Sequence, residues 1–132
     1  MIVVLDASAA IEIALEKEKA QDFRKILKKS DIVLAPDIFP SEITNVFWKY
    51  YSFSDMPAEK CQKGIEYCLD LVDDYIETRT FCREAFSESM KTDHPAYDLF
   101  YLILGRRYNA PVLSKDKKMK KLAKDLRVSV VE

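Results

Sequence analysis

The stretch Ile2-Val3-Val4-Leu5-Asp6-Ala7-Ser8 decides how this chain of 132 residues folds. Its four consecutive apolar residues, mostly β-branched, predict a strand that is buried on both faces. Strands of that kind belong to parallel sheets that helices cover on both sides. Asp6 follows the strand directly, so we expect its carboxylate at the carboxyl end of the strand, where ligands bind in open parallel sheets.

Apolar strands and amphipathic helices alternate along the rest of the chain. Strands are expected at 2–5, 32–35, 75–78, 111–113 and 128–131. Helices are expected within 8–29 (one or two), from 37 to the turn at 52–57, from 57 to about 72, at 80–91, from 93–95 to 108, and at 116–126. Asp37 is the expected N-cap of the second of these segments. The alternation predicts an α/β fold with a parallel sheet between helices, formed by one domain over residues 1–132.

The composition excludes several classes of protein. It is 48% hydrophobic and 33% charged, which is typical of a soluble domain. Only two glycines occur, so a glycine-rich phosphate loop is excluded. Three cysteines without a CxxC motif argue against a disulfide framework or a structural zinc site and favour a reducing cytoplasm. No apolar run is long enough for a membrane span, and we expect neither a signal peptide nor a membrane location.

Positive charge is concentrated near one end of the chain. The formal net charge is -1, yet residues 106–127 contain nine lysines and arginines and only two acids. Such a segment either attracts a polyanion or forms a solvated, lysine-rich helix, and charge alone favours the second interpretation. The candidate contacts to RNA are Arg106, Arg107, Lys115, Lys117 and Lys118.

Four acids occupy positions that could converge: Asp6, Glu42, Asp98 and Asp116. Asp6 and Asp116 follow expected strands, whereas Glu42 and Asp98 lie in the first turns of expected helices. Each acid alone is more simply a helix cap or a partner of the helix dipole. Together they would repel one another unless a cation bound among them. Ligands that are all oxygen select Mg²⁺ or Mn²⁺, which can activate water for attack on a phosphodiester.

The sequences around these acids resemble the motifs of the PIN domain family. The four motifs stand in the family's order and span essentially the whole chain: Val4-Leu5-Asp6-Ala7-Ser8, Ser41-Glu42-Ile43-Thr44-Asn45-Val46, Ala96-Tyr97-Asp98-Leu99-Phe100-Tyr101-Leu102, and Val112-Leu113-Ser114-Lys115-Asp116. The resemblance implies that the four acids are the catalytic, metal-holding residues. It also implies that Ser8, Asn45 and Ser114 support them.

The same resemblance implies a fold and an activity. The expected fold has three layers, with a five-stranded parallel sheet in the order 3-2-1-4-5 flanked by helices. The expected activity is Mg²⁺- or Mn²⁺-dependent cleavage of RNA. Among PIN proteins, the chain is most similar to VapC-type toxins of toxin–antitoxin pairs, which implies an antitoxin partner and a homodimer. The aromatic helical hairpin at 37–75 is a candidate partner and dimer surface, and core packing explains it equally well.

Two positions depart from the family pattern. Gly105 stands where the family usually has alanine, and we expect it only to loosen its helix locally. Lys117 follows Asp116 where some relatives have an acid or a polar residue, which predicts one tight metal and a second that binds weakly or not at all. Neither departure removes a core carboxylate.

Three alternatives stay open on the sequence. The chain could be a PIN nuclease that processes RNA without an antitoxin. It could be a module that binds RNA or protein and whose acids only cap helices. A phosphoacceptor receiver domain also has acids at strand ends, but Glu42 and Asp98 on helices disfavour it.

Overall fold

The computed structural model describes residues 1–131 and contains one five-stranded sheet. Its strands are β1 (Ile2–Leu5), β2 (Ile32–Pro36), β3 (Asp74–Ile76), β4 (Val112–Leu113) and β5 (Val130–Val131). Every neighbouring pair is parallel, and the order is β3-β2-β1-β4-β5. The predicted α/β class and strand order are confirmed. The order also differs from the 2-1-3-4-5 arrangement of receiver domains, so that alternative is wrong.

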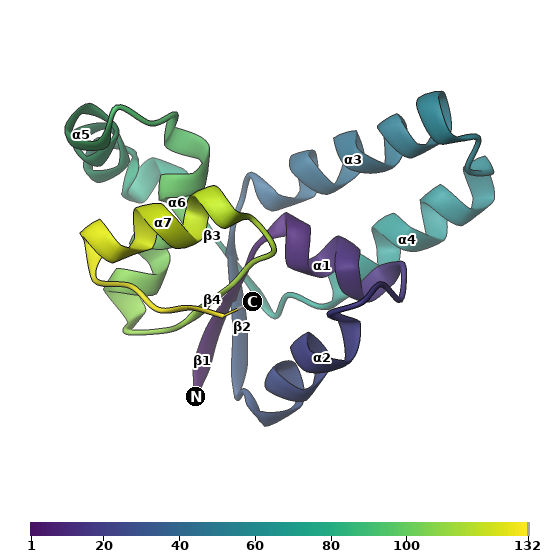
Figure 1. Cartoon of the computed structure of the whole chain (residues 1–132), viewed down its shortest axis with the longest axis horizontal. Coiled ribbons are helices and arrows are strands. Elements are labelled where there is room, and N and C mark those ends of the chain that lie inside the picture. Colours follow the sequence, from purple (N-terminus) through teal and green to yellow (C-terminus); the bar gives the residue numbers. More distant parts are fainter. Residues whose placement is uncertain (132) are drawn as a thin grey trace.

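Helices cover both faces of this sheet (Figure 1). They are α1 (Ala7–Ala14), α2 (Ala20–Lys29), α3 (Phe39–Ser54), α4 (Ala58–Asp70), α5 (Cys82–Thr92), α6 (Ala96–Tyr108) and α7 (Lys117–Leu126), with a short 3-10 turn η1 (Thr78–Thr80). The chain crosses from β1 to β3 in one direction and from β4 to β5 in the other. Right-handed crossovers therefore place α1 to α4 on one face and α6 and α7 on the opposite face. Figure 1 shows this division on either side of the sheet.

The change of direction occurs between β1 and β4, the two central strands. Val4 pairs with Leu34 on one side and with Val112 on the other. Val3, Val4 and Leu5 have no exposed surface, as the continuous apolar run predicted. Ligands of such sheets bind at the carboxyl edge where the connections diverge. In this chain that edge carries Asp6 after β1 and Asp116 after β4.

Two local predictions around β3 are wrong. Asp37 does not cap α3, which begins after Ile38 without a side-chain cap and has a proline in its first turn. The Asp37 carboxylate instead accepts a hydrogen bond from the backbone N–H of Thr78 at 3.1 Å. That bond diverts the chain after Ile76, so the strand expected at 75–78 ends at 76 and η1 follows it.

Gly105 has a different role from the one predicted. A Cβ added there would lie 2.8 Å from Cγ1 of Val128, 2.9 Å from Cγ2 of Val112 and 3.0 Å from the carbonyl oxygen of Ala110. The position therefore lets α6 lie close against β4, which fixes the helix that carries Asp98. Within residues 1–131, no helix combines the length and the apolarity that a bilayer crossing requires.

Candidate active site

Asp6 is the buried acid at the centre of the carboxyl edge. It is only 4% exposed and is the N-cap of α1, where its Oδ1 accepts hydrogen bonds from the N–H of Ala9 at 2.9 Å and the hydroxyl of Ser8 at 2.8 Å. Burial raises its pKa to about 7, against hydrogen bonds that lower it, and the charge of Glu42 adds to the rise. A buried carboxylate with a pKa this high has more charge than its surroundings compensate.

Ser8 and Ser114 join the ends of β1 and β4 around Asp6. The Ser114 hydroxyl donates to Oδ2 of Asp6 at 2.5 Å and accepts from the N–H of Asp116 at 3.0 Å. The Ser8 hydroxyl accepts from the N–H of Lys115 at 2.8 Å. Both serines therefore orient Asp6 and hold the loop that carries Asp116. The structure places both serines beside Asp6, and their supporting role in a metal site stays a prediction.

Glu42 projects from α3 and reaches α6. Its Oε1 accepts a hydrogen bond from the buried hydroxyl of Tyr101. Burial raises the pKa of Glu42, the bond from Tyr101 opposes that rise, and the charge of Asp98 adds to it. Burial beside these acids also raises the pKa of the Tyr101 hydroxyl well above its usual range. Glu42 therefore interacts electrostatically with both Asp6 and Asp98.

Asp98 lies in the first turn of α6 and is held by the chain's only histidine. Nε2 of His94 lies 2.8 Å from Oδ2 of Asp98, with both side chains partly exposed. His94 belongs to the turn between α5 and α6, just before Pro95. The contact fixes the orientation of Asp98 at the helix N-terminus.

Asp116 is the N-cap of α7. Its Oδ1 accepts from the N–H of Lys118 at 2.9 Å, and its side chain is half-buried. A capping role thus explains one oxygen of Asp116, as the simpler interpretation of the sequence had it. The other oxygen, Oδ2, has no hydrogen bond within the described residues.

The four acids share one edge of the sheet but do not form a ready-made cage. Among residues 1–131, no three Asp, Glu, His or Cys side chains are grouped closely enough to hold a metal ion. Asp6, Glu42 and Asp116 also have no ion pair with a basic side chain in that range. Hard oxygen donors with uncompensated charge fit Mg²⁺ or Mn²⁺ in their chemistry. Binding would have to draw the acids closer together.

The predicted basic contacts divide into two groups. Lys117 and Lys118 are exposed in the first turn of α7, beside Asp116. Arg106 and Arg107 lie eight or nine residues after Asp98, about 12 Å or more along α6. They pair there with Glu84 and Glu88 of α5. The structure therefore brings the two lysines to the acids and leaves the two arginines at the opposite end of α6.

Lys115 has a partner that the sequence did not suggest. Its Nζ lies 3.8 Å from Oε2 of Glu12, a residue of α1 that is only 6% exposed. Glu12 also accepts a hydrogen bond from the N–H of Lys19 at 2.9 Å. The ion pair gives the loop before Asp116 a second attachment to α1.

Sequence reasoning missed Tyr101, His94 and Glu12. Tyr101 stands three residues after Asp98 and Glu12 four residues after Ser8, so helical spacing could have placed each on the face of a motif residue. His94 also stands four residues before Asp98, but Pro95 lies between them and α6 begins only at Ala96, so the helical pattern alone did not include it. Asn45, which the motif did suggest, is exposed on α3, and no hydrogen bond within residues 1–131 joins it to Glu42.

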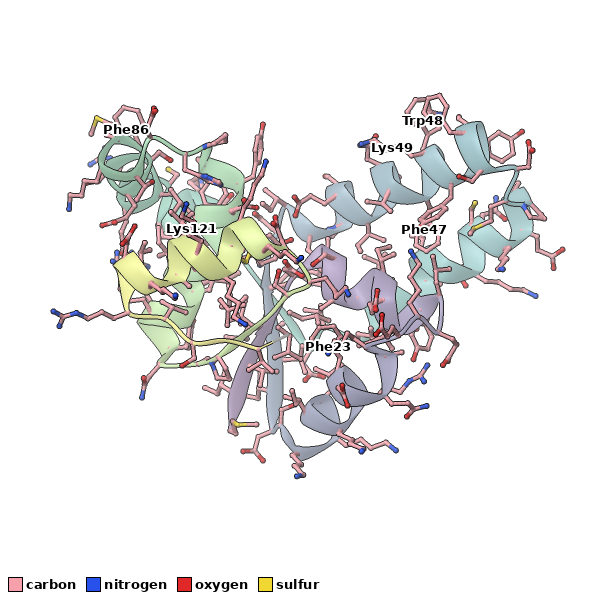
Figure 2. The ribbon with its side chains drawn as sticks, viewed as in Figure 1. Phe23, Phe47, Trp48, Lys49, Phe86 and Lys121 are labelled. Atoms are coloured by element: carbon pink, nitrogen blue, oxygen red, sulfur yellow. The ribbon has the colours of Figure 1, made fainter. Side chains whose placement is uncertain are left out.

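The aromatic hairpin of α3 and α4 combines core packing with an exposed surface. Phe39 and Phe47 are fully buried, and a Cβ on Gly64 would lie 2.4 Å from Cζ of Phe47, so the two helices pack closely. Trp48 is 54% exposed, and Tyr51 and Phe53 are exposed as well. Figure 2 shows Trp48 on the outer side of α3 and Phe47 facing α4. Beside them runs an apolar groove of about 240 Å³, lined by Thr44, Phe47, Trp48, Tyr51, Ala58, Cys61, Gln62 and Ile65.

Comparisons with known proteins agree with the PIN resemblance and with the fold. The sequence model of the PIN domain matches residues 3–125. The fold is similar to the crystal structure of PAE2754 from Pyrobaculum aerophilum, with a TM-score of 0.75 and 14% identity over 98% of this chain and 83% of that one. It is also similar to VapBC2 from Rickettsia felis, crystallised with a DNA fragment from their promoter, with a TM-score of 0.69 and 15% identity over 99% and 98% of the chains. No curated protein matches the sequence.

Proposed function

This chain belongs to the PIN domain family, whose members are generally nucleases that use divalent metal ions, and we propose that it is a Mg²⁺- or Mn²⁺-dependent endoribonuclease. One observation carries the proposal. Asp6, Glu42 and Asp98 come from three different elements and meet where burial raises the pKa values of Asp6 and Glu42. The charge of Glu42 adds to the rise at Asp6, and the charge of Asp98 adds to the rise at Glu42. Carboxylates that only cap helices gain nothing from lying near one another in a buried place. A metal site requires such a cluster, because the bound cation compensates the negative charge.

The side chains divide the work as follows. Asp6 and Asp98 would hold the main ion, and Asp116 would complete its ligands directly or through water. A bound Mg²⁺ or Mn²⁺ lowers the pKa of its water and stabilises the leaving oxyanion. Glu42, whose pKa burial raises, would orient the attacking water and accept its proton. Ser8 and Ser114 orient Asp6, and Asn45 supports Glu42 once substrate is bound.

The partners follow from the same proposal. The chain is the toxin of a toxin–antitoxin pair in the cytoplasm, acts as a homodimer and is silenced by an antitoxin. The likeness to the VapBC2 complex supports this assignment, although at 15% identity that likeness by itself shows only the fold. The exposed Trp48, Tyr51 and Phe53 on the α3–α4 hairpin give such a partner an apolar surface to cover.

The decisive experiment is cleavage of single-stranded RNA with and without millimolar Mn²⁺. Wild type is compared with Asp6→Asn, Asp98→Asn and the control Asp22→Asn, which changes an exposed acid on α2. We expect metal-dependent cleavage by wild type and by the control, and a loss of at least about 100-fold in both site variants. Cleavage by Asp6→Asn at the wild-type rate would refute the assignment.

The alternatives make different predictions in the same preparation. A binding module would retain RNA without cleaving it, and its melting temperature would not respond to Mn²⁺, because an ion that binds only the native state must stabilise it. An RNA-processing nuclease would cleave RNA as proposed, but no small partner protein would copurify with it.

A further inference from the structure

A cleft of about 430 Å³ opens between the turn that joins α5 to α6 and the exposed face of α7. Thr92 lines it from the end of α5, and His94 and Pro95 line it from the turn. Lys118, Lys121 and Leu122 line it from α7. Its volume falls within the range of pockets that hold small ligands, roughly 300–1,000 Å³. Figure 2 shows Lys121 on α7, between that helix and the segment that leads from α5 into α6.

The cleft borders two of the four proposed metal ligands. The ring of His94 forms part of its wall, and Nε2 of the same ring lies 2.8 Å from Oδ2 of Asp98. Lys118 lines it with its side chain, and its N–H donates to Oδ1 of Asp116. A ligand in the cleft would therefore lie directly beside the acidic edge of the sheet.

The charge in the cleft suits an anion at one end. Lys118 and Lys121 are exposed and lie three residues apart, so they occupy one face of α7. Neither forms an ion pair with any residue that the structure describes, unlike Lys115 with Glu12. Asp125 also lines the cleft, four residues beyond Lys121. Its charge disfavours an anion at that end, which leaves the end near Lys118 and His94. There the neighbouring carboxylates of Asp116 and Asp98 also oppose an anion, and the two lysines must outweigh them.

We propose that this cleft binds a backbone phosphate of single-stranded RNA, one that neighbours the phosphodiester held at the carboxylates. Lys118 and Lys121 supply the positive charge that holds the phosphate. The proposal rests on the proposed function, since it takes the acidic edge as the place of cleavage. It adds the path of the strand, which runs from Asp98 past His94 and along α7.

The test measures binding apart from cleavage. A fluorescent 2′-O-methyl oligoribonucleotide, which keeps the phosphates, is titrated in EDTA at several salt concentrations with Lys118→Ala/Lys121→Ala. The matched control Lys28→Ala/Lys124→Ala removes the same charge from exposed positions on α2 and α7 that do not line the cleft. The fraction folded is followed by thermal melting for each variant.

We expect the cleft variant to bind about tenfold more weakly, and the slope of log K against log salt to fall by about 0.7 for each phosphate that the variant no longer neutralises. The control should bind less than about threefold more weakly, and Asp125→Asn should bind more tightly than wild type. Equal weakening by the two lysine pairs would overturn the proposal. If replacing Lys118 and Lys121 weakens binding as expected but the wild-type protein cleaves no RNA, the proposed function fails and the phosphate site stands.

Discussion

The hydroxyl of Tyr101 on α6 donates a hydrogen bond to Oε1 of Glu42 on α3, which joins two helices through residues 59 positions apart in the chain. The two helices approach the site from opposite faces of the sheet. The side chain of Tyr101, which is almost fully buried, therefore holds Glu42 from the other side of the carboxyl edge. This contact determines how the carboxylate of Glu42 is positioned, and removing the hydroxyl oxygen of Tyr101 abolishes it.

Tyr101→Phe should raise the pKa of Glu42 further. The bond from Tyr101 lowers that pKa, while burial and Asp98 raise it, so only the raising causes remain in the variant. NMR titration of the side-chain carboxyl in metal-free protein measures the change. We also expect a decrease of about 1–2 kcal/mol in the free energy of unfolding, because the variant lacks one buried hydrogen bond. An unchanged pKa of Glu42 would contradict the role given to Tyr101.

Asp6 should make the metal-free protein less stable as pH rises. Its pKa in the folded state is about 7, above the value of about 3.9 in an unfolded chain. The folded state therefore binds the proton more tightly. This tighter proton binding contributes to the free energy of unfolding, and the contribution is fully present below about pH 4. It is on the order of 4 kcal/mol and is lost as the pH rises to 7.

Asp6→Asn tests this sign directly. Melting curves between pH 4 and 8.5 in EDTA should show a variant that matches wild type in acid and exceeds it above pH 7. Millimolar Mn²⁺ should then raise the melting temperature of wild type and not that of the variant. A variant less stable than wild type at pH 8 in EDTA would show that Asp6 is compensated by something other than a metal.

Gly105→Ala should destabilise the fold although alanine is the better helix former. Alanine gains up to about 1 kcal/mol in helix propensity, but its Cβ meets Val128, Val112 and a backbone carbonyl at 3.0 Å or less. Overpacking of this kind costs about 1–3 kcal/mol. Chemical denaturation should show a net decrease of about 1 kcal/mol in the free energy of unfolding, against no decrease for Gln21→Ala on the exposed face of α2.

Glu12 and Lys115 should be coupled energetically. Glu12→Gln keeps an acceptor for the N–H of Lys19 but removes the charge that faces Lys115. A double-mutant cycle with Lys115→Met should give a coupling energy of about 0.5–2 kcal/mol, because Glu12 is buried and screening there is weak. Additive effects would mean that the pair does not hold the loop before Asp116.

Much of the fold was predictable because its central strands are continuous apolar runs. Residues 2–5 and 32–35 form strands as expected, and the order of the sheet followed from the family motifs. The edge strand β3 was misplaced because it is short and half-exposed, so its end depends on a bond from Thr78 to Asp37. A hydrogen bond between a side chain and a distant part of the backbone leaves no periodic pattern in the sequence.

The acids of the site were found by their places at strand ends and helix starts, and their catalytic roles stay predictions. Their partners were not found. Tyr101 and Glu42 meet only after α3 and α6 pack on opposite faces of the sheet, and His94 reaches Asp98 through a turn shaped by Pro95. Sequence patterns place residues on elements, whereas these contacts depend on how the elements meet.

The hydrogen bond from Ser114 to Asp6 spans 108 residues of chain and has a consequence for synthesis. A ribosome makes Asp6, Glu42 and Asp98 well before it makes Ser114 and Asp116. Because β4 inserts beside β1 only after that long loop closes, the pairing that completes the acidic edge belongs to a late step of folding. The growing polypeptide therefore remains without its full set of carboxylates until translation has passed residue 116.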